Sequence, residues 1–300
     1  QGFWLQRSRR ASVRNGKMPP VKFDDIPKTA NEVLNDDYQL SGYVFTAKQK
    51  TSWNGSVLTS TFDVFPLKDS CKTPAKLAWR LPTPLGLPHF SVDKLEMDKG
   101  GKFKLEASSD KVLKNKSLKM DVKSDLKDLA AITASAHYTG TKDLQVKFET
   151  KVMKPQDCIF EATYAPPFKN AMVTLGVKGT NATVTCPDLG VRVLCGSFFA
   201  SVMAKQKLSA CTASCMYKVS DQFKCAVTYD HGGKANGSFS IGCSYDVAKG
   251  TKVKAKVQQD QCVSCSVKHD VSKGFTVLAG AKFDTKKMDI SSCGLKLSIE

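Results

Sequence analysis

The stretch from Thr251 to Lys268, TKVKAKVQQDQCVSCSVK, decides the fold. Its first half alternates small or apolar residues with lysines: Thr251, Val253, Ala255 and Val257 against Lys252, Lys254 and Lys256. Its second half repeats the alternation, with Val263, Cys265 and Val267 against Ser264, Ser266 and Lys268. Successive side chains of a β-strand point to opposite faces. The pattern therefore predicts two strands of a hairpin, each with one apolar and one polar face.

The same period of two recurs along most of the chain. Further copies are centred on Leu105, Met120, Val146, Cys225, Ile241, Ala279 and Leu297. Between Gly42 and Ile299 there are about nineteen such segments, which leaves roughly ten residues for each strand, the length that crosses a bilayer when tilted. No run of eighteen or more apolar residues occurs, so a transmembrane helix is excluded.

One apolar and one polar face in nearly every segment favours a closed barrel with lipid outside and water inside. A soluble β-sandwich also alternates, but it rarely needs so many strands of one length. The alternation is weakest from Cys186 to Val219, where neither Val193–Ala200 nor Cys211–Met216 is cleanly two-sided.

The segment from Phe23 to Tyr38 has a different period and is predicted to be an amphipathic helix. Its apolar residues recur at three- and four-residue spacing: Phe23, Ile26, Ala30, Val33 and Leu34. Pro27 would break a helix interior but is tolerated in a first turn. We expect a short docking stripe on one side of this helix and a polar face on the other.

The composition favours mobile anions over nucleic acid as partners. The net charge is +17, and only six of the 45 basic residues are Arg, which leaves 39 Lys. Dispersed lysines give a diffuse positive potential, whereas nucleic-acid readers favour Arg, and the basic faces of the strands at Lys102–Lys104 and Lys252–Lys256 carry no interleaved aromatic residue. The four His residues stand alone and no nucleotide-binding or nucleophile motif is present, so we expect no enzyme, no cofactor and no metal site.

Eleven cysteines form no disulfide framework or metal-ligand pattern, and we expect free thiols that behave as small hydrophobes. At the other end of the chain, residues 1–17 contain four Arg and no acidic residue. We expect a basic, disordered extension over 1–17, a helix with its linker over 18–41, and a barrel over 42–300.

Three stretches carry a family resemblance. The first, Met18-Pro19-Pro20 followed by Phe23–Tyr38, resembles the N-terminal helix of mitochondrial voltage-dependent anion channels, the eukaryotic outer-membrane porins. The segment from Tyr245 to Val267 is similar to the eukaryotic porin signature, with departures at Ala248, Gln258 and Gln259. The last is similar to the terminal signal that the outer-membrane assembly machinery binds, through Ser292, Gly294, Leu297 and Ile299.

The resemblance implies an all-β transmembrane barrel of nineteen strands, the count already known for this family, with the amphipathic helix inside the pore. It also implies a voltage-gated channel that passes ATP, ADP, phosphate and small ions across the mitochondrial outer membrane. We expect weak anion selectivity, because the helix carries one Lys and five acidic residues between Phe23 and Tyr38. On this reading the pore-lining and gating residues are Asp25, Lys28, Asn31, Glu32 and Asp36, and the lumen-facing basic residues are Lys102, Lys104, Lys252, Lys254 and Lys256.

The expected partners are membrane lipids, with nucleotides and small anions as permeants and no nucleic acid. Assembly into a homo-oligomer, or with other outer-membrane or respiratory-chain proteins, stays open. Two alternative functions also remain at this point: a protein-import barrel of the same fold, which would prefer cations, and a soluble all-β binding protein.

Overall fold

The structure is a computed structural model that describes residues 21–51, 55–64, 75–86, 89–110, 117–168, 171–233 and 237–300. The basic extension expected over residues 1–17 lies outside them. Nineteen strands form in the described residues. Their bounds are β1 Gly42–Lys50, β2 Val57–Asp63, β3 Ala75–Leu81, β4 Phe90–Met97, β5 Phe103–Ser109, β6 Leu118–Asp125, β7 Asp128–Thr141, β8 Leu144–Lys151, β9 Lys154–Tyr164, β10 Met172–Thr180, β11 Asp188–Cys195, β12 Phe198–Lys205, β13 Ala210–Lys218, β14 Phe223–His231, β15 Ser238–Ala248, β16 Thr251–Gln258, β17 Cys262–Ser272, β18 Phe275–Asp284 and β19 Asp289–Ile299.

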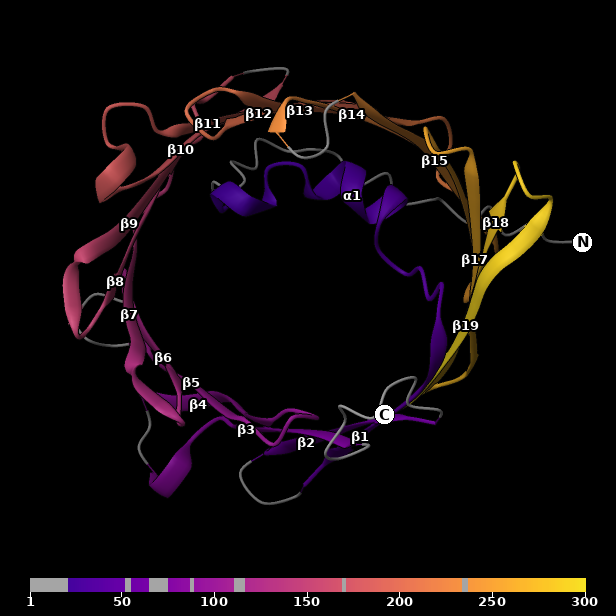
Figure 1. The fold of residues 1–300 in the computed structure, drawn as a ribbon. Coiled ribbons are helices and arrows are strands. Elements are labelled where there is room, and N and C mark those ends of the chain that lie inside the picture. The colour runs from indigo at the N-terminus through magenta and orange to yellow at the C-terminus, as the bar shows by residue number, and fades with distance from the viewer. Residues whose placement is uncertain are drawn as a thin grey trace, which may run out of the picture.

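The strands close into a single barrel (Figure 1). Each strand pairs with the next in antiparallel fashion, and β1 pairs in parallel with β19, with Gly42 opposite Gly294 and Phe45 opposite Leu297. A meander with an odd number of strands brings its first and last strands together in the same direction, so one parallel pair is unavoidable. Closure removes the open edges that a membrane would not tolerate. The predicted transmembrane barrel is confirmed.

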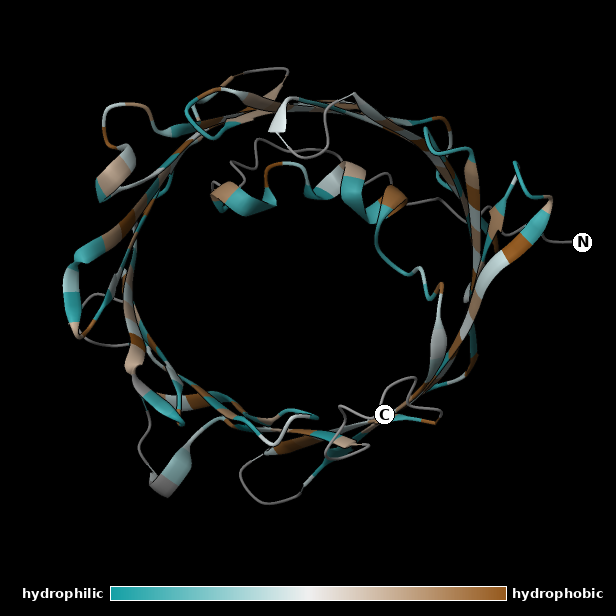
Figure 2. Ribbon diagram, in the orientation of Figure 1, coloured by the Kyte–Doolittle hydropathy of each residue, from teal (hydrophilic) through white to brown (hydrophobic). Residues whose placement is uncertain are grey.

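Large apolar side chains cover the outer face and polar ones line much of the inner face. Tyr245 and Ile241 on β15 are 44% and 47% exposed toward the outside, while Ser264 and Ser266 on β17 are buried on the inside. The alternation appears in Figure 2 as brown and teal bands along the strands.

The N-terminal segment lies within the barrel, against the wall (Figure 1). It consists of a short 3-10 turn, η1 (Phe23–Asp25), and an α-helix of seven residues, α1 (Lys28–Leu34). The prediction of one helix from Phe23 to Tyr38 was therefore too long at both ends. Two other 3-10 turns lie between strands, η2 (Pro84–Gly86) and η3 (Asn181–Thr183).

Three residues explain where the helix begins and ends. Pro27 has no N–H to donate, so it serves as the N-cap, and its carbonyl accepts from the N–H groups of Ala30 and Asn31 at 3.1 Å each. At the other end Asn35 is the C-cap and donates its N–H to Asn31 O at 2.7 Å, and Asp37, with a φ of 57°, then turns the chain away from the helical path. No helix in the described part of the chain is long and apolar enough to cross a membrane.

Candidate functional site: the helix inside the barrel

The 3-10 turn η1 is held in a hollow that two glycines leave in the wall. Phe23 and Ile26 are fully buried and pack against Met203 of β12. Gly176 of β10 and Gly190 of β11 are opposite each other in the sheet and lie beneath these two side chains. A Cβ added at Gly190 would lie 2.6 Å from Ile26 Cδ1. Only glycine leaves room at these wall positions.

The helix α1 docks on the next strands along. Ala30, Val33 and Leu34 are at most 3% exposed and form one apolar cluster with the wall. The wall contributes Phe199 of β12, Met216 of β13 and Ala226 of β14. Gly242 of β15 again leaves space, because a Cβ there would lie 2.9 Å from Leu34 Cδ2. The docking residues expected from the sequence thus all lie in the contact with the wall.

This footprint explains the stretch with the weakest alternation, residues 186–219. Phe199, Met203 and Met216 face the helix rather than lipid, so their strands are apolar on both faces. In the sequence this contact is visible as a weakened alternation of apolar and polar residues, but the sequence analysis did not connect that weakening with the helix.

Polar contacts tie the start of the segment to the wall. The N–H of Phe23 donates to Glu161 Oε1 of β9 at 2.6 Å, and this carboxylate is buried. Lys178 of β10 forms an ion pair with Asp24 at 2.8 Å. Neither Glu161 nor Lys178 was identified from the sequence, since both belong to ordinary alternating strands.

Lysines of the wall bind the end of the helix. Lys254 Nζ donates to the carbonyl oxygens of Glu32, at 2.6 Å, and Asp36, at 3.0 Å. A cation suits this position because the last carbonyls of a helix lack partners within it and carry partial negative charge. Asp37 lies 3.2 Å from Lys268 and 3.6 Å from Lys254. Burial alone would raise the pKa of Asp37, but the two lysines outweigh it and hold that pKa below its ordinary value of 3.8.

The linker that follows crosses the wall over a second pair of glycines. Gly280 of β18 and Gly294 of β19 are opposite each other. A Cβ at Gly280 would lie 2.5 Å from Gln39 O, and one at Gly294 would lie 2.7 Å from Ser41 N. The close approach is therefore provided by glycines in the wall, and the linker itself stays poor in glycine.

None of the expected pore-lining residues belongs to the buried apolar stripe that contacts the wall. Lys28, Glu32 and Asp36 are exposed, and Asp25 and Asn31 are half-buried. Lys28 Nζ lies 3.8 Å from Asp25 Oδ1, one turn away. The segment, which Figure 1 places inside the barrel, thus has exposed charges of both signs.

The five lysines predicted to face the lumen occupy four different environments. Lys254 and Lys256 are buried beneath the segment, where Lys256 Nζ lies 4.7 Å from the ring centroid of Tyr38. Lys252, on the same face of β16, pairs with Asp246 at 3.4 Å. Lys104 lies on β5 opposite Glu96. Lys102 precedes β5, in the turn where its N–H donates to Asp98 at 3.0 Å.

The expected assembly residues all belong to β19. Leu297 and Ile299 pair with Phe45 and Ala47 of β1 at the parallel seam. Ser292 is opposite Lys282 of β18. Gly294 lies under the linker, so its lack of a side chain has a structural reason independent of any assembly signal.

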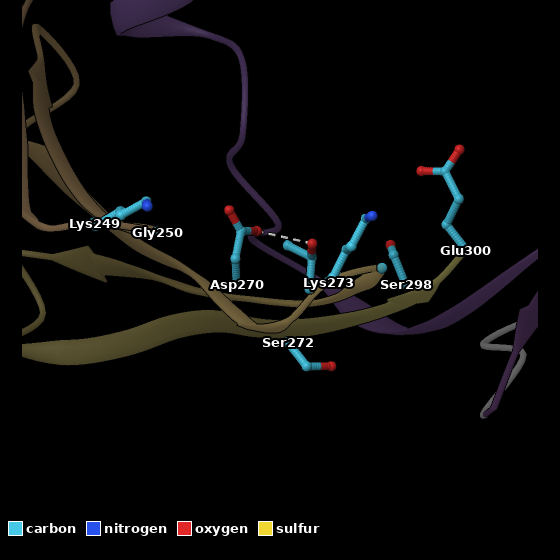
Figure 3. A pocket seen from close by; sticks show the side chains of 9 residues that line it. Lys249, Gly250, Asp270, Ser272, Lys273, Ser298 and Glu300 are labelled. Atoms are coloured by element: carbon cyan, nitrogen blue, oxygen red, sulfur yellow. Dashed lines mark hydrogen bonds between the residues drawn. The ribbon is translucent and has the colours of Figure 1, made fainter.

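A small cavity of about 540 Å³ opens at one mouth of the barrel (Figure 3). It lies between the β15–β16 turn, the β17–β18 turn and the end of β19. Figure 3 shows Asp270, Lys273 and Glu300 pointing to one side of the sheet and Ser272 to the other. The hydroxyl of Thr276 donates to Asp270 Oδ1 at 2.9 Å. The residues that line the cavity include both lysines and carboxylates, so its charge is mixed. Within the described ranges, no group of three or more His, Cys, Asp or Glu could hold a metal ion.

Comparison with known proteins finds one matching family model. Residues 179–294 match the family model of the eukaryotic porins. This match covers less than half of the 300 residues, and that part of the chain is similar to the eukaryotic porins. Among solved structures, the chain is similar to a triple mutant of the Rhodopseudomonas blastica porin, with 10% identity, a TM-score of 0.44, and coverage of 69% of this chain and 90% of that one. A second mutant of the same porin shares 11% identity, with a TM-score of 0.42 and coverage of 75% and 94%. No curated protein matches the sequence.

Proposed function

We propose that this protein is a voltage-gated, weakly anion-selective channel that passes ATP, ADP, phosphate and small ions across the mitochondrial outer membrane. The similarity of residues 179–294 to the eukaryotic porins, together with the barrel fold, supports a channel for small solutes and an outer-membrane location. The observation that carries the finer proposal is the charged segment docked inside the lumen on a separate apolar footprint.

Charge balance supports weak anion selectivity. The chain has 45 basic and 28 acidic residues, and a positive potential in the lumen raises the local concentration of anions. The segment opposes this effect with its acidic residues, but wall lysines compensate two of them: Lys178 pairs with Asp24, and Lys268 with Asp37. Glu32 and Asp36 remain exposed toward the lumen, so the residual preference for anions is small.

The separation between wall and segment supports gating. The strands complete their hydrogen bonds around the ring without the helix, so the helix can move without breaking the barrel. Its docking rests on five apolar side chains and a few polar contacts, and a voltage acts on the charges that it carries. We infer that closure at higher voltage changes the position of this segment.

Purified protein in a planar bilayer under a salt gradient tests the proposal. We expect a reversal potential that indicates modest anion preference, a conductance that falls at high voltage of either sign, and passage of ATP. Strong cation preference would instead favour a protein-import barrel. A conductance independent of voltage would refute gating while leaving the channel intact.

A further inference from the structure

Two cysteines face each other across neighbouring strands on the outside of the barrel. Cys225 of β14 is directly opposite Cys243 of β15. Both point outward, because Tyr245 and Ile241, two residues on either side of Cys243, are exposed on the outer face. Both thiols are free.

The hydrogen-bond pattern places these cysteines in the closer of the two kinds of cross-strand pair. The N–H of Asp246 donates to Gln222 O at 2.9 Å, so these opposite residues form a hydrogen-bonded pair. Hydrogen-bonded and non-hydrogen-bonded pairs alternate along an antiparallel ladder. Cys225 and Cys243 lie three positions along the ladder from Gln222 and Asp246, so they form a non-hydrogen-bonded pair. The Cα atoms of such a pair are about 4.5 Å apart. That separation lies within the range that a disulfide bridges.

The neighbouring pair on the same face shows that side chains do meet across these strands. Phe223 and Tyr245 have ring centroids 6.2 Å apart in an edge contact. The cysteine pair therefore lies between this aromatic pair and the aliphatic pair Val227 and Ile241.

Other outward cysteines at the same level provide a contrast. Following the register from Cys243 leads to Ala255, then Cys265, then Ala281, then Cys293. An alanine on the intervening strand separates each of these thiols from the next. Among the cysteines of the described residues, the register places only Cys225 and Cys243 directly opposite each other.

We propose that Cys225 and Cys243 form a dithiol site that reduces hydroperoxides at the lipid face of the barrel and closes to a cross-strand disulfide. One sulfur attacks the outer peroxide oxygen, the O–O bond breaks, and an alcohol or water leaves after taking up a proton. The resulting sulfenic acid is attacked by the second thiol, an S–S bond forms, and water leaves. The dithiol is oxidised by two electrons and the hydroperoxide is reduced by two. The apolar surroundings disfavour the thiolate, so we expect slow closure.

The test uses the full chain in liposomes, reduced and then freed of reductant. One arm adds hydrogen peroxide from the aqueous phase and the other adds cumene hydroperoxide, which enters the acyl region. Remaining thiols are alkylated, and peptides are mapped by mass spectrometry without reduction. We expect a cross-linked peptide that joins Cys225 to Cys243, lighter by two hydrogen atoms than the separate peptides. Faster closure with cumene hydroperoxide would identify the lipid phase as the source of oxidant, and faster closure with hydrogen peroxide the aqueous phase.

Matched variants come from the same row. Cys225→Ala and Cys243→Ala should each abolish the cross-link, whereas Cys265→Ala and Cys293→Ala should retain it. Alanine already occupies this row at positions 255 and 281, so the substitutions suit the wall. Complete alkylation of Cys225 and Cys243 after both treatments would overturn the proposal, as would cross-links that mainly involve Cys265 or Cys293. If a variant fails to insert, the peptide map of the unsubstituted protein still shows whether Cys225 and Cys243 are cross-linked. The presence or absence of this cross-link does not depend on whether the channel is gated.

Discussion

Gly190→Ala should loosen the helix from the wall without changing a residue of the helix. The three nearest atoms that the new Cβ would meet all belong to the docked segment: Ile26 Cδ1 at 2.6 Å and two ring carbons of Phe23 at 3.2 and 3.6 Å. Contacts below 3.0 Å cannot persist, so either Ile26 and Phe23 shift or the segment leaves its hollow.

The expected size follows from the cost of overpacking. An extra methyl group in a well-packed contact costs about 1 to 3 kcal/mol. That cost falls on the docked state alone, because the same methyl group is accommodated on an empty inner wall. The ratio of docked to undocked segments should therefore fall by about 5- to 150-fold.

The assay is the conductance of the reconstituted channel as a function of voltage. Gly190→Ala should shift the voltage of half-closure and leave the fully open conductance of the barrel in place. Ile26→Val removes the clashing Cδ1 at a cost of about 0.5 to 1.5 kcal/mol, so the double variant should gate more like the wild type than Gly190→Ala does. Gly179→Ala is the matched control, because its Cβ would meet the ring of Phe160 in the wall, at 2.5 Å, and not the segment.

The reasoning is refuted if Gly190→Ala gates like the wild type. It is also refuted if Gly179→Ala shifts gating as much, since the effect would then arise from strain in the wall. If adding Ile26→Val to Gly190→Ala does not restore wild-type gating, Ile26 does not occupy the hollow in the state from which the channel closes.

Three further outcomes are expected. Removing residues 1–38 should leave a β-rich, conducting barrel with altered closure at high voltage, and a chain that cannot insert would show that the helix is part of the fold. Gating should change in acid, because the pKa of Asp37 in the docked state is below its ordinary value of 3.8. Ionised Asp37 therefore stabilises the docked segment fully above pH 3.8, and this stabilisation is lost as the pH falls through the lowered pKa. Asp37→Asn should remove this acid dependence, and an unchanged pH profile would contradict the role of the Lys268 ion pair. Glu32→Gln with Asp36→Asn should move the reversal potential toward greater anion preference, whereas a shift toward cations would place these carboxylates away from the permeation path.

Local pattern was sufficient to predict the secondary-structure elements of this protein. A strand's two faces are set by residues two apart, so Thr251–Val257 revealed its lipid and luminal sides without any knowledge of its neighbours. The apolar stripe from Phe23 to Leu34 likewise followed from local spacing. The interruption at Pro27 could be placed only roughly, because a proline is compatible both with a first turn and with a break.

The docking site depended on the tertiary structure. Lys254 and Glu32 are 222 residues apart in the chain, and only closure of the barrel brings the lysine beneath the last helical turn. The glycine hollow at Gly176 and Gly190 is invisible in sequence, where each glycine is only a weak point in a strand. The sequence alone thus determined that this chain makes amphipathic strands and one amphipathic helix, since those depend on neighbours within a few residues. Ring closure decided which wall the helix occupies and which lysines it covers, because long-range register sets which inner side chains lie side by side.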